Sequence, residues 1–180
     1  ISPCGGGKLV EIVTGGVKPG TESTVIDSTT GRVFFGNYSG ANDNYWTWHE
    51  STGLSALVSG HDTPGLGSST VDSTGRVFFG NNTDTNDAFW TWKDGSGLSE
   101  IVSTGQERVG QYSTIVDSSD RVYFGNYDTT NSEFWTWKDG SGLSALGSGF
   151  SRPGNYSVAV SSDNRIFFSA PNQSANCLSI

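Results

Sequence analysis

Few side chains in this sequence have the types and spacing that acid–base catalysis requires. The 180 residues include two histidines, His49 and His61, and Asp62 directly follows the second. A histidine beside a carboxylate can accept and return a proton, so this pair is a candidate for acid–base work. No serine-nucleophile motif, phosphate-binding glycine loop or zinc-ligand spacing accompanies it. The residues therefore favour binding over catalysis, with no catalytic residue assigned and an enzyme kept as the alternative.

Loops rich in Asn, Asp and Thr could either hold a cation or fix their own shape. Three aligned copies of one loop carry asparagine at two equivalent positions, the first of which is Asn37, Asn81 and Asn126. The fourth copy has lost both, since Ala170 and Ala175 stand there. This joint loss indicates side chains that cap backbone groups in one loop conformation. Calcium is the alternative because oxygen ligands are plentiful, although neither EF-hand nor nonapeptide spacing is present.

Four Asn-x-Ser/Thr triplets are candidate glycosylation sites of a secreted protein. They begin at Asn37, Asn81, Asn155 and Asn172. The alternative is that a chain rich in asparagine and serine forms such triplets by chance.

The elements that position these residues belong to a sequence repeat. The segment Arg-Val-Phe-Phe-Gly-Asn starts at Arg32 and Arg76, recurs with one change at Arg121, and returns more loosely at Arg165. Trp-Thr-Trp recurs with the same spacing at 46–48, 90–92 and 135–137. We therefore predict a single domain over residues 1–180. Its repeats are 16–59, 60–104, 105–148, and 149–180 together with 1–15.

Each repeat has the pattern of four short strands, and no window shows a helical period. In the second repeat, 69–71 is a β-branched run, 72–75 has hairpin-turn residues, and strands follow at 76–79, 90–92 and 98–102. Four-stranded units of this length are typical of propeller blades. The prediction is an all-β fold, a four-bladed β-propeller with four antiparallel strands per blade.

The two ends of the chain are expected to complete one blade. Residues 8–14 have the pattern of an outermost strand and 157–180 that of inner strands, so N- and C-terminal strands in one blade would close the ring. Cys4 and Cys177 would both lie in this blade, and we predict a disulfide between them that contributes about 4–5 kcal/mol. Two free thiols are the alternative. With the absence of any methionine, the disulfide favours a secreted protein.

Residues that break the repeat are the better candidates for a ligand site. They lie in the loops that precede each first strand, which in propellers surround one mouth of the central channel together with the loops after the second strands. Aligned on a shared glycine, one position holds Lys18, Thr63, Arg108 and Arg152, and another holds Glu22, Gly67, Tyr112 and Tyr156. With His61 nearby, a polar and aromatic site is predicted. Its candidate ligand-binding residues are Lys18, Glu22, His61, Arg108, Tyr112, Arg152 and Tyr156. Four solvated loop tips with unrelated side chains are the alternative.

The repeated tryptophans and arginines are predicted to be structural. Tryptophans two residues apart on a strand share one face, which suits packing between blades. A repeated sugar-stacking platform is the alternative for these rings. Each arginine follows a turn that contains an acidic or hydroxyl residue, so we expect local pairing of the guanidinium with Asp27, Asp72 or Asp117.

The repeat also resembles known families. The hairpin Asp-Ser-Thr-Gly-Arg-Val-Phe-Phe-Gly at 72–80 resembles the strand pair of NHL-type and regucalcin-like propellers. The unit at 89–101 is similar to bacterial extracellular repeats of the HAF type. The resemblance spans the whole chain and implies a propeller fold. Regucalcin-like enzymes need a metal-binding carboxylate set in the channel, and no matching residues are found, so the resemblance implies the fold and not the activity.

Charge and hydropathy exclude some classes of function. The formal net charge of −8 argues against a nucleic-acid binder, and no apolar run approaches the roughly 18–20 residues of a membrane span. The leading hypothesis is a secreted carbohydrate-binding, lectin-like propeller with ligand sites in its loops and no cofactor, calcium being the one candidate. The alternative is an enzyme or small-molecule binder with a single site at the channel mouth. A protein-interaction scaffold is a third possibility.

Overall fold

A computed structural model describes residues 18–38, 43–81, 87–106, 108–127 and 132–170. For residues 103–106 it describes the backbone alone. The predicted Cys4–Cys177 disulfide and the glycosylation site at Asn172 lie outside these residues.

The described residues form antiparallel sheets of sequential strands. The first sheet contains β1 (Val25–Ile26), β2 (Val33–Gly36), β3 (Asp43–His49) and β4 (Gly53–His61). The second contains β5 (Thr70–Val71), β6 (Val77–Gly80), β7 (Asp87–Lys93) and β8 (Gly97–Gln106). The third contains β9 (Ile115–Val116), β10 (Val122–Gly125), β11 (Ser132–Lys138) and β12 (Gly142–Phe150). The last is the two-stranded pair β13 (Ala159–Val160) and β14 (Ile166–Phe167). Among the described residues no helix occurs, and hence none that could cross a membrane.

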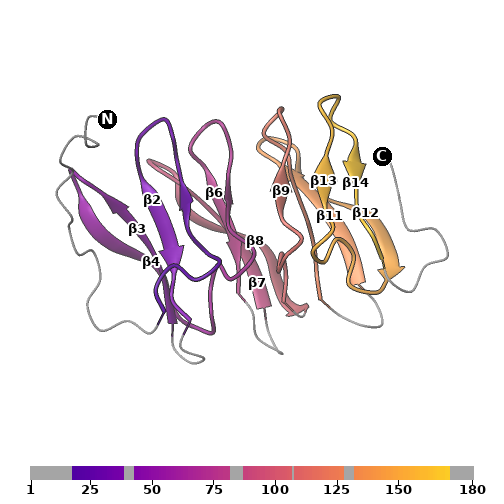
Figure 1. The fold of residues 1–180 in the computed structure, drawn as a ribbon, viewed down its shortest axis with the longest axis horizontal. Helices are drawn as coiled ribbons and strands as arrows, with labels where there is room; N and C mark the ends of the chain where they lie inside the picture. The colour runs from indigo at the N-terminus through magenta and orange to yellow at the C-terminus, as the bar shows by residue number, and fades with distance from the viewer. Residues whose placement is uncertain (1–17, 39–42, 82–86, 107, 128–131, 171–180) are drawn as a thin grey trace, which may run out of the picture.

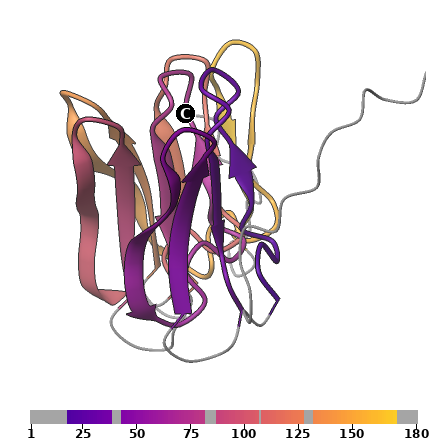
Figure 2. The same ribbon diagram turned by 90° about the vertical axis from the view of Figure 1, so that its left-hand side faces the viewer.

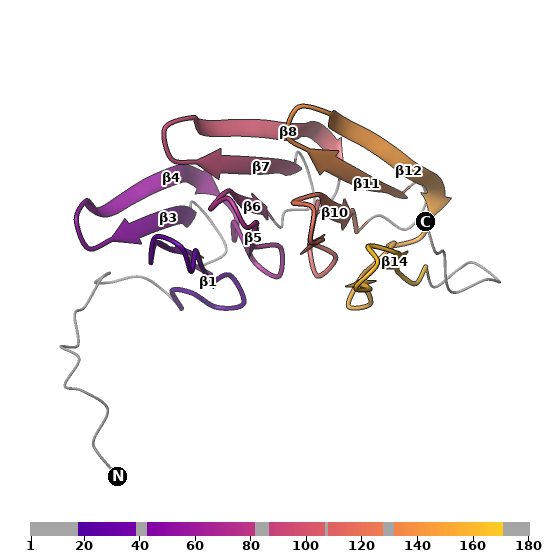
Figure 3. The same cartoon turned by 90° about the horizontal axis from the view of Figure 1, so that it is seen from above.

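The sheets stand side by side in a row (Figure 1). Seen from above, β4, β8 and β12 lie along one long side of the row, and β1, β5 and β14 lie along the other (Figure 3). A view along the row has the first sheet nearest and the others behind it (Figure 2). The repeated antiparallel sheets confirm the all-β, blade-like part of the prediction. The first sheet and β13–β14 lie at opposite ends of the row (Figure 3).

Aromatic rings between neighbouring sheets form the core. Tyr45 stacks on Phe79, with ring centroids 4.0 Å apart and planes at 17°. The same stack recurs at the next two interfaces, as Phe89 on Phe124 at 4.0 Å and Phe134 on Phe168 at 4.1 Å. In each pair, the first ring lies on the third strand of one sheet. The second ring lies on the second strand of the next sheet or, for Phe168, directly after that strand. The hydrophobic core is therefore a series of interfaces rather than one central cluster.

In the second and third sheets, the second tryptophan of the Trp-Thr-Trp segment packs against the preceding sheet. Trp92 lies edge-on to Phe34 at 5.5 Å, and Trp137 lies edge-on to Phe78 at 5.4 Å. The prediction that these rings pack between blades is confirmed at both positions. Trp92 is also stacked beneath the guanidinium of Arg32, 5.1 Å from the ring centroid.

The prediction of local arginine pairs is wrong at two of the repeats. Arg76 pairs at 2.7 Å with Asp139 of the next sheet, and Arg32 pairs at 3.5 Å with Asp94. The turn carboxylate of Asp72 instead accepts hydrogen bonds from the backbone N–H groups of Thr74 and Arg76, at 2.9 and 3.0 Å. A short aspartate folds back on its own turn more readily than it reaches a guanidinium, and the long arginine side chain extends along the tryptophan of the next sheet.

The glycine at the end of β2 and of β6 is explained by close contact between sheets. A Cβ on Gly80 would collide with the carbonyl oxygen of Val109 in the loop of the next sheet. Gly36 meets the carbonyl oxygen of Pro64 in the same way. Because the obstacle is backbone on both sides, neither chain can move aside without breaking the interface. These glycines therefore set how closely successive sheets approach.

Candidate ligand-binding site

The loops that precede β1, β5, β9 and β13 share one unusual backbone path. In the third loop Arg108, Gly110 and Tyr112 have φ of +50°, +81° and +50°. A left-handed conformation costs a non-glycine residue about 1–2 kcal/mol, so the fold must stabilise it. The N–H of Gly110 donates to the carbonyl oxygen of Gly125 at 2.7 Å, which ties the loop to the end of β10. The equivalent tie recurs in the other three repeats, from Gly20, Gly65 and Gly154.

A line of backbone hydrogen bonds connects these loops from sheet to sheet. The N–H of Gly67 donates to the carbonyl oxygen of Glu22 at 2.7 Å, and that of Tyr112 donates to Gly67 at 2.6 Å. The N–H of Tyr156 donates to Tyr112 at 2.8 Å. These are the four residues that the aligned sequence placed at one equivalent position. The structure therefore brings them together in order along the row.

Gly67 has no side chain, and this makes the four equivalent positions unlike one another. A Cβ there would lie 2.5 Å from the ring of Tyr112, so the ring occupies the space that a side chain at Gly67 would need. From this position the phenol O–H of Tyr112 donates to Oε2 of Glu22 at 2.6 Å. Burial, and then the hydrogen bond to Glu22, raise the pKa of Tyr112 well above its usual value. The phenol is therefore protonated at neutral pH and acts as a donor.

The other side of the Tyr112 ring stacks on Tyr156. The two ring centroids are 4.0 Å apart and the planes lie at 18°. Tyr156 is 72% exposed, so its outer face is available to a ligand. An exposed aromatic ring held by a second ring is a rigid platform for the apolar face of a ligand.

Three basic side chains lie over tyrosines beside this platform. Lys18 Nζ is 5.1 Å from the ring centroid of Tyr38. Arg108 and Arg152 both lie over Tyr127, with Cζ 5.0 and 4.1 Å from its centroid. Such cation–π contacts hold the basic groups in place.

A cavity of about 250 Å³ opens among these side chains, and we call it the mouth pocket. Its lining residues are Tyr38, Leu66, Arg108, Gln111, Tyr112, Tyr127 and Tyr156. Gln111 is 8% exposed, and within the described part of the chain its Oε1 has no hydrogen-bond partner. Arg152 Nε is likewise buried without a partner among the described residues.

The sequence identified part of this pocket. Arg108, Tyr112 and Tyr156 line it, while Glu22, Lys18 and Arg152 contact lining residues. Two further tyrosines, Tyr38 and Tyr127, were missed. A signal existed for them, because Gly-Asn-Tyr ends the second strand in the first and third repeats and not in the second, where Asn82 follows.

His61 lies elsewhere. It is the last residue of β4 and pairs with Asp43 across the sheet, so its side chain belongs to a sheet face rather than to a loop tip. Its ring packs edge-on against Trp90 at 4.9 Å. The other histidine, His49, contacts the hydroxyl of Ser51 at 2.7 Å. Neither is among the residues that line the mouth pocket.

The loop asparagines cap backbone groups, as the sequence predicted. Oδ1 of Asn37 accepts from the N–H of Asn44 at 2.8 Å, and Oδ1 of Asn81 accepts from Ala88 at 2.8 Å. The same bond in the third repeat joins Asn126 to the N–H of residue 133 at 2.9 Å. Within the described ranges no three acidic, histidine or cysteine residues are grouped so as to hold a metal ion.

These contacts bear on two of the glycosylation sites. Nδ2 of Asn81, the atom that a glycan would join, donates to Asp87 at 2.9 Å, and Asn81 is 3% exposed. Nδ2 of Asn37 donates to Asp43 at 2.5 Å. Asn155 is half-buried. Glycosylation stays a prediction at all of these positions.

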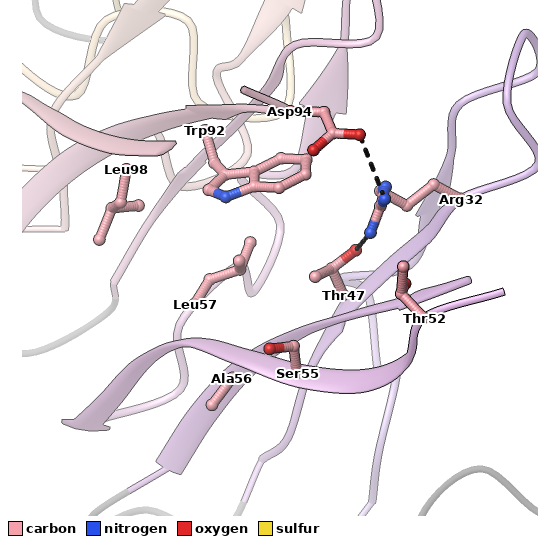
Figure 4. A pocket seen from close by; sticks show the side chains of 9 residues that line it. All are labelled: Arg32, Thr47, Thr52, Ser55, Ala56, Leu57, Trp92, Asp94 and Leu98. Atoms are coloured by element: carbon pink, nitrogen blue, oxygen red, sulfur yellow. Dashed lines mark hydrogen bonds and ion pairs between the residues drawn. The ribbon is translucent and has the colours of Figure 1, made fainter. Parts of the chain in front are cut away.

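A second cavity, of about 370 Å³, lies between the first and second sheets (Figure 4). Arg32 extends over Trp92 there and reaches both Asp94 and the hydroxyl of Thr47, at 3.5 and 3.3 Å (Figure 4). Leu57 and Leu98 line the opposite part of the cavity. Because the guanidinium already covers the indole, this tryptophan serves the interface and offers less ring surface to a sugar.

The sequence matches no family profile, and a comparison with curated proteins finds no relative. Solved structures with propeller-like folds are similar to it. TolB from Acinetobacter baumannii superposes with a TM-score of 0.54 and 12% identity, over 91% of this chain and 39% of TolB. A protein from Bacteroides uniformis, proposed to be a 6-phosphogluconolactonase, gives a TM-score of 0.52 and 12% identity, over 87% of this chain and 52% of its own. The chain thus spans about half or less of these structures, and the likeness shows the fold.

Proposed function

We propose that this chain is a lectin-like carbohydrate-binding propeller module whose site is the mouth pocket. The observation that carries the proposal is the stacked pair Tyr112–Tyr156, whose outer ring is 72% exposed. An aromatic face suits the C–H face of a pyranose, and the surrounding polar groups suit its hydroxyls. Gln111 Oε1 supplies a buried acceptor, and Arg152 Nε supplies a buried donor.

The pocket supports one site per chain rather than a repeated site. The residues equivalent to Tyr112 and Tyr156 in the first two repeats are Glu22 and Gly67, so the platform exists once. The repeated tryptophans Trp92 and Trp137 are engaged by Phe and Arg side chains of the preceding sheet.

Calorimetry with sugars selected on a glycan array tests this proposal. We expect a stoichiometry near one and a loss of affinity of about 10-fold or more in Tyr156→Ala, since a stacked aromatic contributes about 1 kcal/mol beyond its buried area. Tyr156→Phe keeps the ring and should keep most of the affinity. Leu143→Ala is the matched control, because Leu143 is 41% exposed on β12 and outside the pocket. Absence of binding to any mono- or oligosaccharide would overturn the proposal.

A small-molecule binder or enzyme that uses the same pocket is the second candidate. The asymmetry of the lining favours it, because a single non-repeated site is what one small ligand needs. A thermal-shift screen of non-sugar metabolites separates the two candidates. A non-sugar hit that is lost in Arg108→Gln, together with no sugar binding, would establish the second candidate instead.

We also propose that the row closes into a four-bladed ring in a secreted protein, with Cys4–Cys177 joining the terminal segments. The repeated contacts of Arg32 and Arg76 with a Trp and an Asp of the following sheet support a particular closing contact. By the same register, Arg165 of the last sheet would meet Trp48 and Glu50 of the first. Arg165 is 58% exposed and pairs locally with Asp163 at 2.8 Å.

Cross-linking tests the closure. A short bismaleimide applied to dilute Glu50→Cys/Arg165→Cys protein should link the two positions within one chain, as read by peptide mapping. Links between chains alone would overturn the closed ring, and mapping would also show whether Cys4 and Cys177 are joined. Occupied glycosylation at Asn155, seen as added hexose mass on the secreted protein, would support secretion from a eukaryotic cell.

A further inference from the structure

We propose that the ligand of the mouth pocket is an acidic saccharide, a sugar ring that carries a carboxylate or a phosphate. This inference rests on the proposed function, and it adds the chemical class of the ligand. Three observations carry it: the local charge, the position of the Arg152 guanidinium group and the unpartnered buried polar atoms.

The local charge is opposite to that of the molecule. The chain carries a formal charge of −8, yet Lys18, Arg108 and Arg152 are three of its ten basic residues and lie around one cavity. Two acids lie beside them: Glu22 already accepts the hydrogen bond of Tyr112, and Asp87 accepts the backbone N–H of Arg108. Among the described residues that line the cavity there is an arginine and no Asp or Glu. A basic pocket on an acidic molecule raises the local concentration of anionic ligands.

The guanidinium group of Arg152 is held beside the cavity by a tyrosine of its lining. Both guanidinium groups lie over the ring of Tyr127, at 5.0 and 4.1 Å from its centroid. An oxyanion bound beside Arg152 would accept charge-assisted hydrogen bonds from its guanidinium group. Guanidinium forks match the paired oxygens of carboxylates and phosphates.

Buried polar atoms complete the recognition. Within the described part of the chain, Gln111 Oε1 and Arg152 Nε are buried without hydrogen-bond partners, and Gln111 is 8% exposed at the wall of the cavity. A buried donor or acceptor left unpaired is costly, so a bound molecule that pairs it gains affinity. Gln111 Oε1 calls for a hydroxyl donor and Arg152 for an oxyanion. A ligand that offers both, with an apolar face for Tyr156, is a hydroxylated ring with an acidic group.

The size of the cavity suits one such ring. Its volume of about 250 Å³ is below the roughly 300–1,000 Å³ of sites for drug-sized molecules. The pocket therefore fits a terminal or isolated acidic sugar unit, with any further units outside it along Tyr156.

Calorimetry on the whole chain tests the inference with matched ligand pairs. The ligands are glucuronate, glucose 6-phosphate, glucose, and acetate and phosphate as free anions. We expect an acidic sugar to bind at least 10-fold more tightly than glucose at low salt, with the advantage decreasing as ionic strength rises. Tighter binding of glucuronate assigns the anion as a carboxylate, and tighter binding of glucose 6-phosphate assigns it as a phosphate. Either result supports the inference.

Variants of the arginines test whether these residues cause the preference for acidic sugars. In Arg152→Gln the ratio of acidic-sugar to glucose affinity should decrease towards one, and Arg152→Lys should restore part of it. Arg108→Gln provides a second test if Arg152→Gln does not fold, as judged by circular dichroism. Lys138→Gln, at the end of β11 and outside the pocket, is the charge-matched control and should leave the ratio unchanged.

Three outcomes would overturn the inference. Equal affinity for glucose and both acidic sugars would refute the acidic class while the carbohydrate-binding proposal stands. Free acetate or phosphate that binds as tightly as the acidic sugars would refute the saccharide. Absence of binding to every sugar would refute the inference and the proposed function together.

Discussion

The interfaces between sheets and the mouth pocket are built from the same repeat, but they use it in opposite ways. At the interfaces, one aromatic stack recurs three times with centroids 4.0–4.1 Å apart and planes at 17°. At the mouth, one equivalent position holds Glu22, Gly67, Tyr112 and Tyr156 in turn, and each side chain does something different. Identity between copies therefore marks the residues that hold the sheets together. Difference between copies marks those available for a ligand.

The largest expected effect on stability is the loss of a stacked ring at an interface between sheets. Phe124 is fully buried and stacks on Phe89, so Phe124→Ala should lower the free energy of unfolding by about 3–5 kcal/mol. Urea denaturation measures the change, with Leu143→Ala as a control expected to lie within about 0.5 kcal/mol of the parent. A loss below 1 kcal/mol in Phe124→Ala would mean that the stacks do not carry the interfaces.

The free energy of unfolding should be almost as sensitive to substitution of the glycines that allow successive sheets to approach closely. Gly80→Ala would place a Cβ against the carbonyl oxygen of Val109, and we expect about 3 kcal/mol of destabilisation because this obstacle is backbone. Gly140→Ala is the control. It has φ of +76° and open space around its Cα, so only the backbone strain of about 1 kcal/mol should appear. Equal effects in the two variants would contradict the close-contact argument.

Gly67→Ala should affect the mouth more than the interfaces. The new Cβ would displace the ring of Tyr112 and with it the hydrogen bond to Glu22. We expect about 1–2 kcal/mol of destabilisation from backbone strain and about a 10-fold loss of ligand affinity. Gly31→Ala, also at positive φ and in open space, should show the strain without the loss of affinity. Unchanged affinity in Gly67→Ala would remove Tyr112 from the site.

The smallest effect should come from the turn carboxylates and depend on pH. Burial alone would raise the pKa of Asp117, but hydrogen bonds from Arg121, Ser119 and Tyr123 outweigh it and hold the pKa below its usual value. A lowered pKa in the folded state stabilises the protein above the unfolded pKa of about 3.9, and this contribution is lost as the pH falls through the folded value. Asp117→Asn should therefore cost about 1 kcal/mol at pH 7 and less at pH 3, measured by urea denaturation. A cost that does not change with pH would contradict this assignment.

The repeat made the fold predictable from sequence, because three sets of markers at one spacing define strands, turns and their order. Alignment on the shared glycine also placed Glu22, Tyr112 and Tyr156 together, since equivalent positions of neighbouring repeats are neighbours in space. The sequence could not predict which side chains of different repeats form ion pairs with each other. Arg32 and Asp94 are 62 residues apart, and no local pattern links them.

Strand ends were the other source of error. The sequence pattern predicts His61 in a loop, but β4 continues through it, and this difference of one or two residues places the side chain on a sheet face instead of at the mouth. Tyr127 was missed for a different reason. Its role depends on two arginines from two separate loops, and it becomes visible only when the sheets are stacked.

The backbone line through Glu22, Gly67, Tyr112 and Tyr156 has a consequence for how such a protein can change over evolutionary time. Every link in it joins a main-chain N–H to a main-chain carbonyl, so replacing a side chain leaves the link in place. Apart from Gly67, whose side-chain space is taken by the ring of Tyr112, each position needs only to tolerate φ near +50°, which asparagine, aspartate and glycine also do. Specificity can therefore drift one residue at a time around the mouth, while the scaffold that presents those residues is inherited unchanged.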